Sequence, residues 1–211
     1  MKQILGNKNK GFSLIEVAIA IVVIGLIVGF TIKGKELIHT AKLNATIEQV
    51  HSIKMATQMF VERYGALPGS FSNAKKEISD ALENGSGNGE IFSIEDAKRF
   101  WAHLAASDLI SLDLSENSMP ASKVGGYFSV SSKITGRNGI WIILSMGTSD
   151  NNAFQGIVSQ EDAYRIDKKT DTKNPNTGDV MTRKAENLTA ISDEYDIKSK
   201  TKDCVIMFRI W

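Results

Sequence analysis

One apolar run near the N-terminus constrains this chain more than any other feature. Across residues 12–32 the only charged side chain is that of Glu16. As a helix, a run of this length extends about 32 Å, which matches the roughly 30 Å hydrocarbon core of a bilayer. The run therefore predicts a single membrane-spanning helix.

The residues before the run indicate its orientation. Residues 1–11 contain Lys2, Lys8 and Lys10 and no acidic residue. An excess of positive charge beside an apolar run is typical of the cytoplasmic side, so we expect the rest of the chain outside the cytoplasm. A removed secretory signal is the competing interpretation, but the run exceeds the usual ~7–15 apolar residues and no A-x-A-like site follows it.

Glu16 needs a cationic partner if it enters the membrane. An ionised carboxylate within lipid costs on the order of 2.5 kcal/mol or more, so an intramembrane glutamate is a functional hypothesis by default. If the chain is cut before Phe12, the new α-amino group lies one helical turn from Glu16, within one subunit or between neighbours. The alternative interpretation is a charge tolerated near the membrane surface.

The segment around Glu16 carries a recognisable pattern. Residues 10–17 read KGFSLIEV, which resembles the processing site of type IV pilins and type II secretion pseudopilins. In that family a prepilin peptidase cuts after the glycine and methylates the new N-terminal residue. The resemblance implies cleavage between Gly11 and Phe12, N-methylation of Phe12 and an assembly role for Glu16. It also implies other pilin or pseudopilin subunits and an inner-membrane assembly platform as partners.

The helical pattern continues beyond the membrane-spanning run. No proline interrupts residues 12–67, so we expect one helix over 12–64, apolar in residues 12–33 and amphipathic in residues 34–64. The apolar residues that recur at helical spacing are Leu37, Ala41, Ile47, Val50, Thr57, Phe60, Val61 and Tyr64.

Residues 65–211 have the pattern of an α+β head domain. Strand signals occur at residues 126–131, 140–146 and 204–211. We expect a small antiparallel sheet in which the terminal strand pairs beside residues 140–146. Packed on the long helix, the sheet would complete a pilin-like ladle, which is also the layout that the resemblance implies.

Two shorter helices are predicted within the head. Ser93 and Asp96 have capping-box spacing and begin an apolar stripe that runs to about Ile110. Ser159 and Asp162 have the same spacing and begin a helix that extends to residue 169. Glycines across residues 84–89 favour a loop, and this loop lacks the lysine of a phosphate-binding P-loop.

The composition points away from catalysis and nucleic acid. A net charge of +1 gives no reason to expect a nucleic-acid partner. Cys204 lies in an apolar run, as a small buried residue would. His39, His51 and His103 lack the i, i+4 spacing of a zinc-binding helix, and no nucleophile motif occurs. We therefore predict that the chain is not an enzyme.

Calcium is the one cofactor to weigh. Some pseudopilins that the chain resembles hold Ca²⁺ in a head-domain loop, and several oxygen-bearing side chains occur together in this sequence. The spacing does not fit an EF-hand and lysines interrupt it, so a solvated loop without a cofactor is favoured. The candidates are Asp167, Asp171, Asn174, Asn176 and Asp179.

Two functions follow from these patterns. The preferred one is a structural subunit of an inner-membrane-anchored filament, either a type II secretion pseudopilus or a type IV pilus, with its head in the periplasm. The alternative is a single-span anchor for a periplasmic binding or enzymatic domain, which predicts no cleavage after Gly11.

Overall fold

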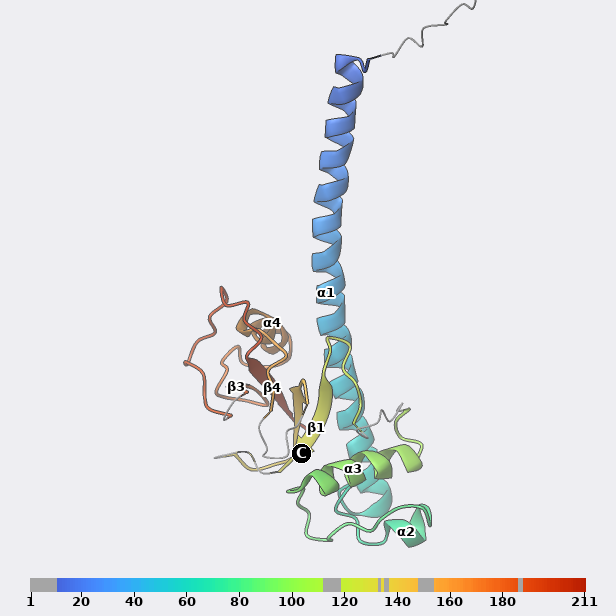
Figure 1. Cartoon of the computed structure of the whole chain (residues 1–211). Helices are drawn as coiled ribbons and strands as arrows, with labels where there is room; N and C mark the ends of the chain where they lie inside the picture. Colours follow the sequence, from blue (N-terminus) through green and yellow to red (C-terminus); the bar gives the residue numbers. More distant parts are fainter. Residues whose placement is uncertain (1–10, 112–118, 133, 135–136, 148–153, 186–187) are drawn as a thin grey trace, which may run out of the picture. The chain divides into compact units, whose positions relative to one another are not determined.

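The computed structural model describes residues 11–111, 119–132, 134, 137–147, 154–185 and 188–211. Of the cytoplasmic leader expected over residues 1–11, residues 1–10 lie outside this set. The chain divides into two compact units, Met1–Ala41 and Lys42–Trp211. In chain order the elements are α1 (Leu14–Tyr64), α2 (Ala74–Glu77), α3 (Ile94–Ala106), β1 (Tyr127–Ser131), β2 (Trp141–Ser145), α4 (Gln160–Thr170), β3 (Val180–Lys184) and β4 (Cys204–Arg209) (Figure 1).

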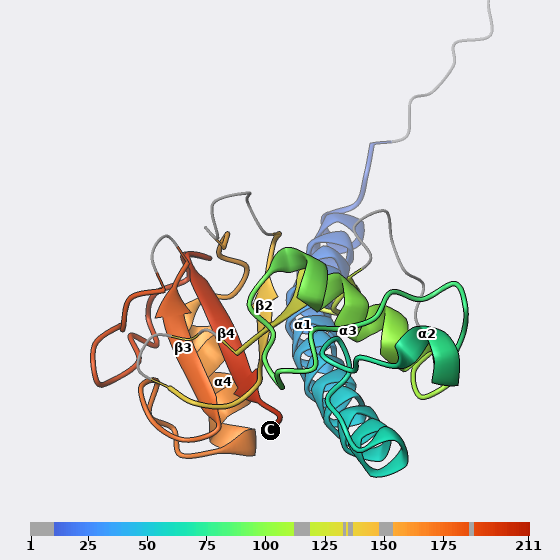
Figure 2. The ribbon, with the colours of Figure 1, turned by 90° about the horizontal axis from the view of Figure 1, so that it is seen from below.

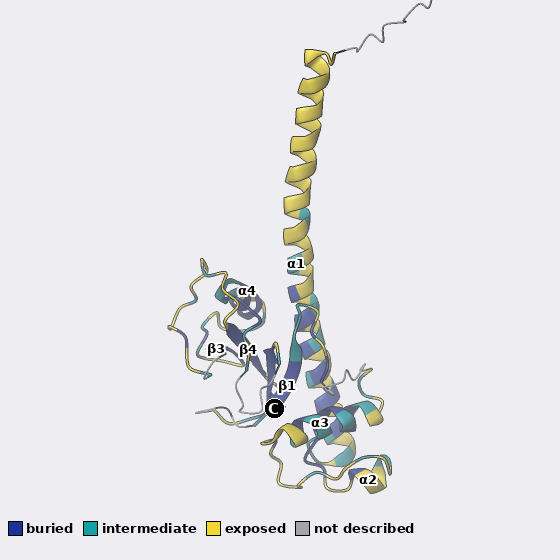
Figure 3. Cartoon of the chain, viewed as in Figure 1, coloured by how far each residue is buried: buried dark blue, intermediate teal, exposed yellow. Residues whose placement is uncertain are grey.

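The predicted long helix is confirmed. α1 runs for 51 residues and begins two residues after Phe12. In the first unit its apolar side chains are exposed, as the colouring in Figure 3 shows. Its most apolar stretch has a mean hydropathy of 2.7, and α1 is long and apolar enough to cross a membrane.

In the second unit α1 is the central helix of the core. Its buried residues recur every three or four positions, as one face of a helix requires. These residues are Leu43, Thr46, Ile47, Val50, Ile53, Ala56, Thr57 and Phe60. Leu37 and Ala41, the first residues of the expected amphipathic pattern, are exposed, and the buried face begins at Leu43.

The second unit contains a four-stranded antiparallel sheet in the order β1-β2-β4-β3. β2 pairs with both β1 and β4, with Ile142 opposite Val130 on one side and opposite Phe208 on the other. All five residues of β2 are buried. The prediction that the terminal strand pairs beside this strand is confirmed, and with it the α+β fold class.

The two faces of the sheet pack into different clusters. On one face, Phe128, Ile142 and Ile206 join the core that includes α1. On the other, Trp141, Met181 and other alternate residues form a smaller cluster. Because successive side chains in a strand point to opposite faces, a register shift of one residue would exchange the two sets.

α3 and α4 flank the core. The Ser93 hydroxyl accepts a hydrogen bond from the backbone N–H of Asp96, and the Asp96 carboxylate accepts one from the N–H of Ser93, so the predicted capping box is present. α3 ends at Ala106, four residues earlier than predicted, and Asp108 beyond it has a left-handed φ of 56°. Figure 2 shows α4 against the sheet and α3 crossing α1.

The turn after α1 requires a glycine. Gly69 has a φ of +79°, and a Cβ there would lie 2.7 Å from the carbonyl oxygen of Asp96. The Gly-rich loop that follows is fastened to this turn, because Gly85 N–H donates to Phe71 O and Gly87 N–H donates to Ser70 O. These glycines therefore allow the backbone of the loop to pack closely against the turn.

Candidate functional site

The predicted cleavage site precedes the first turn of α1. Gly11, Phe12 and Ser13 have no regular secondary structure and are exposed, with 88% of Phe12 accessible. A Cβ built at Gly11 would meet nothing within 4 Å. The fold therefore gives no steric reason for glycine at position 11, and the bond that follows it lies in an accessible segment.

Ser13 and Glu16 together cap the start of α1. Ser13 O accepts the first helical hydrogen bond from Val17 N–H, and the Ser13 hydroxyl accepts one from Ile15 N–H at 3.4 Å. The Glu16 carboxylate folds back and accepts a hydrogen bond from Ser13 N–H at 2.8 Å. The bond from Ser13 N–H to Glu16 is one half of the capping box that S-x-x-E spacing signals, a pattern that was missed from the sequence; the Ser13 hydroxyl bonds the N–H of Ile15 and not that of Glu16.

This cap places the Glu16 carboxylate beside the chain that enters the helix. Its oxygen lies within hydrogen-bond distance of the backbone nitrogen of Ser13, the residue after Phe12. An amine at Phe12 would be one residue further along the same backbone. Negative charge at a helix N-terminus is also favoured by the helix dipole.

The remainder of the first unit presents an apolar surface. Large apolar side chains from Leu14 to Ile38 are 46–91% exposed. Burying one such side chain contributes about 1.5–3 kcal/mol, so water is an unfavourable environment for this half of α1. Lipid or the helices of other chains would supply the missing contacts.

The calcium candidates do not converge on one point. Asp171 Oδ2 accepts hydrogen bonds from Asp179 N–H at 2.6 Å and Val180 N–H at 3.0 Å. This carboxylate therefore links the end of α4 to the start of β3 and stabilises the loop between them. The Asp179 side chain instead faces Arg209, with 3.7 Å between Oδ1 and Nε. The described residues contain no group of three or more His, Cys, Asp or Glu positioned to hold a metal ion.

Asp167 is the buried member of the candidate set. Its two carboxylate oxygens accept hydrogen bonds from Lys173 N–H at 3.1 Å and the Tyr195 hydroxyl at 2.9 Å. Burial raises the pKa of Asp167 above its usual value. The same hydroxyl lies 3.1 Å from Thr182 Oγ1, and burial raises the pKa of Tyr195. The network joins α4, β3 and the connection to β4.

The asparagines of the candidate set also bond within the head. Asn174 Oδ1 accepts a hydrogen bond from Asn176 N–H at 2.9 Å. The Asn176 amide donates to the carbonyl oxygen of Ile191 at 3.2 Å, and its Oδ1 accepts from Arg183 at 2.8 Å. The five candidates therefore organise the loop through separate contacts.

His103 and Cys204 have structural environments. His103 Nδ1 accepts a hydrogen bond from Gly69 N–H at 3.0 Å, so the proton resides on Nε2, which lies 2.9 Å from Glu83 O. Burial of the ring lowers the pKa of His103. Cys204 is fully buried, and burial raises the pKa of its thiol to about 12. Such a thiol is a poor nucleophile.

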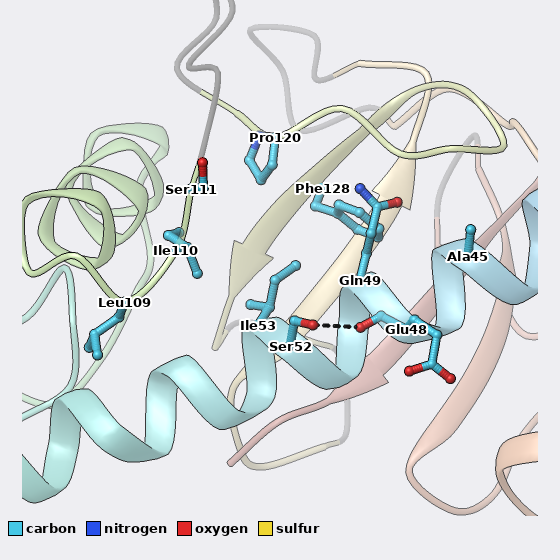
Figure 4. Close-up of a pocket in the computed structure, with 10 residues that line it drawn as sticks. All are labelled: Ala45, Glu48, Gln49, Ser52, Ile53, Leu109, Ile110, Ser111, Pro120 and Phe128. Carbon is cyan, nitrogen blue, oxygen red and sulfur yellow. Dashed lines mark hydrogen bonds between the residues drawn. The ribbon is translucent and has the colours of Figure 1, made fainter.

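A groove of about 490 Å³ lies beside α1 in the second unit (Figure 4). It is lined by apolar side chains that include Ile53, Leu109 and Phe128, and among the described residues that line it only Glu48 is ionisable. A single carboxylate supplies no acid–base pair or nucleophile–base pair.

The N-terminal segment of the chain matches a known family model. Residues 6–32 match the family model of the prokaryotic N-terminal methylation motif. The match confirms that a prokaryotic N-terminal methylation motif occupies this segment, which contains Gly11, Phe12 and Glu16, while the roles expected of these three residues stay predictions. No curated protein matches the chain. Among solved structures, the major Type IV pilin PilA1 from Clostridium difficile gives a TM-score of 0.44 at 12% identity, covering 82% of this chain and 96% of that chain.

Proposed function

We infer from the pilin-type N-terminus over residues 6–32 that this chain is a structural subunit of a membrane-anchored filament. The observation that carries the inference is the methylation motif at the start of a long, exposed, apolar helix. A helix of this kind is suited to exchanging lipid contacts for contacts with the same helix of other subunits. The chain would then act by assembly and not by catalysis.

Processing is the first step of the proposed function. A prepilin peptidase cuts between Gly11 and Phe12 and methylates the new amine of Phe12. The exposed, non-helical conformation of these residues supports this step, because a protease must bind its substrate backbone in an open conformation. The requirement for glycine at position 11 then comes from the peptidase, because the surroundings of Gly11 in the fold leave room for a side chain.

Assembly is the second step. Cleavage creates a positive charge at Phe12, beside the carboxylate that already folds back to Ser13. Pairing between this amine and Glu16, within one subunit or across two, removes the cost of an isolated charge in lipid. Processing thereby makes the subunit competent to enter the filament.

In the inner membrane, the uncut chain has its N-terminus in the cytoplasm and its head in the periplasm. An inner-membrane assembly platform and other pilin or pseudopilin subunits are the partners, in either a type II secretion pseudopilus or a type IV pilus. The head is the part that meets cargo, a surface or the next subunit.

Mass measurement tests this function directly. The full chain is expressed in cells with and without a prepilin peptidase, extracted from membranes, and examined by intact mass and N-terminal sequencing. We expect a peptidase-dependent product that begins at Phe12 and carries one additional methyl group. An uncut chain in both cells would favour the rival, a membrane anchor for a periplasmic domain.

A further inference from the structure

A small cavity of about 100 Å³ lies within the second unit, where α1 meets the end of α4 and the β3–β4 edge. Four apolar residues that are at most 8% exposed form its floor. They are Ile47, Val50, Val180 and Phe208. His51, Lys54 and Arg209 lie around the floor, together with Asp179. We call this cavity the basic notch.

The basic notch has more positive than negative charge. Arg209 faces Asp179 across 3.7 Å, and both side chains are about half exposed at 50% and 58%. Lys54 is partly buried and makes no hydrogen bond or ion pair with the described residues. No acidic residue lies three or four positions from Lys54 on α1. A second carboxylate would therefore complete the charge pairing.

The volume of the notch limits what can bind in it. Pockets for small organic ligands measure roughly 300–1,000 Å³, several times this volume. About 100 Å³ suits one side chain that is anchored in a pocket at the centre of a protein interface. An apolar floor beside the unpaired Lys54 and the half-exposed Arg209 fits a side chain with methylene groups and a terminal carboxylate.

The chain itself presents such a side chain. Asp193, Glu194 and Asp196 are exposed in the connection between β3 and β4. Asp193 accepts a hydrogen bond from Asn176, and Asp196 Oδ1 accepts one from the backbone N–H of Lys198. The Glu194 carboxylate has no partner among the described residues. Its backbone oxygen accepts a hydrogen bond from the Ser192 hydroxyl.

The notch and this acidic connection lie on different parts of the second unit. In Figures 1 and 2 the connection between β3 and β4 lies on the side of the sheet away from α1, whereas four residues of the notch belong to α1. A contact between two different patches on identical chains is heterologous. Repeated from copy to copy, such a contact generates a ring where the rotation closes and an open helical filament where it does not.

We propose that the basic notch receives the Glu194 side chain of a neighbouring copy of this chain. The Glu194 carboxylate pairs with Lys54 and Arg209, and its methylene groups rest on the apolar floor. The proposal rests on the filament function and adds to it a specific contact between heads. The pairing would also hold neighbouring copies in one register.

A charge exchange tests the pairing. The variants Lys54→Glu, Glu194→Lys and the double variant are introduced into the full chain in cells that assemble the filament, and sheared filaments are quantified. Like charges replace an ion pair in each single variant, so we expect about a tenfold loss of filaments, which corresponds to about 1.4 kcal/mol. The double variant restores the pairing in reverse and recovers most of the yield.

Matched variants separate a local effect from a change in total charge. Lys168→Glu on α4 and Glu62→Lys on α1 make the same changes at exposed positions outside the notch, and both should assemble normally. Equal losses in these variants would overturn the proposal. A double variant as defective as the single ones would exclude Glu194 as the occupant.

Crosslinking provides a readout that does not depend on yield. Copies that carry Lys54→Cys are expressed together with copies that carry Glu194→Cys, while the native Cys204 remains buried. We expect disulfide-linked dimers only when both variants are present. If the wild-type chain forms filaments, but the paired cysteine variants give no disulfide-linked dimers and the single charge variants assemble normally, the contact at the notch is overturned and the filament function is retained. A wild-type chain that is neither processed nor assembled would overturn both.

Discussion

The Glu16 carboxylate accepts a hydrogen bond from the backbone N–H of Ser13, with 2.8 Å between the two atoms. Glu16 therefore has two separable roles. As a hydrogen-bond acceptor it caps α1, and as a charge it is the proposed partner of the amine at Phe12. The two roles can be distinguished because glutamine retains the acceptor and loses the charge.

The first prediction concerns the charge of Glu16. In Glu16→Gln the cap persists, so cleavage after Gly11 should proceed normally. The amine at Phe12 would then remain unpaired, which costs about 3 kcal/mol in a buried setting, so we expect about 100-fold fewer filaments. N-terminal sequencing measures the cleavage, and shearing of filaments measures assembly.

Glu16→Asp serves as the control for this prediction. Aspartate retains the charge on a shorter side chain, so it should assemble better than glutamine. Normal assembly of Glu16→Gln would show that the acceptor is sufficient and would remove the proposed charge pairing.

The second prediction concerns Gly11. Gly11→Leu should abolish cleavage while the melting temperature of the head stays unchanged, because no atom lies within 4 Å of a Cβ at this position. The matched variant Gly34→Leu has equally open surroundings but lies outside residues 6–32, so it should still be cut. Efficient cleavage of the Gly11 variant would place the processing site elsewhere.

The elements with local signals were predicted well from the sequence. Ser93 and Ser159 both cap helices by accepting a hydrogen bond from the N–H three residues later. β2 and β4 were visible as apolar runs, since both are buried across nearly their whole length. Each of these signals acts within a few residues and needs no knowledge of the remaining chain.

β3 was missed because its stabilising contacts are distant in sequence. Its residues VMTRK include the polar Thr182 and Arg183, which are buried. The Arg183 guanidinium donates to Pro175 O at 3.2 Å, and Asp171 accepts the N–H of Val180. Composition alone indicates an exposed segment here, whereas the preceding loop supplies the partners that allow burial.

The candidate site was predicted in part. The methylation motif was read correctly from residues 10–17, because its pattern is contiguous. The basic notch was not predictable, since Lys54, Thr170 and Arg209 come from three separate elements. Only the pairing of β3 with β4, and the packing of α4 near α1, bring them together.

The third prediction is a pH dependence of stability due to His103. Burial lowers the pKa of this ring in the folded chain, so its stabilising contribution is complete above the unfolded value near 6.5. As the pH falls below 6.5, the unfolded chain takes up a proton that the folded chain does not. Stability should therefore decrease by at most about 1.4 kcal/mol per pH unit between about pH 6.5 and 5.5.

His103→Asn tests this assignment. The asparagine Oδ1 can replace Nδ1 as the acceptor for Gly69 N–H but does not titrate in this range. Thermal melts of both proteins from pH 7 to pH 5.5 should show a smaller loss of stability in the variant. Parallel curves would assign the pH dependence to other groups, because His39 and His51 are common to both proteins.

The fourth prediction distinguishes the aspartates at the two ends of the loop before β3, the partly buried Asp171 and the exposed Asp179. Asp171→Ala removes the acceptor for two backbone N–H groups, one of them on the buried Val180. We expect a loss of about 2 kcal/mol, or roughly 4–8 °C in melting temperature. Asp179→Ala removes only an exposed ion pair with Arg209 and should cost at most about 1 kcal/mol.

The same pair of variants addresses calcium. If Asp171 acts through the backbone of its own loop, wild-type melting temperatures should be equal in chelator and in about 1 mM Ca²⁺, a concentration that saturates or half-saturates most extracellular calcium modules. A Ca²⁺-dependent rise that is lost in both Asp171→Ala and Asp179→Ala would instead assign a cation to this loop. The rise would then follow ligand binding to the folded state, and its size would increase with the Ca²⁺ concentration.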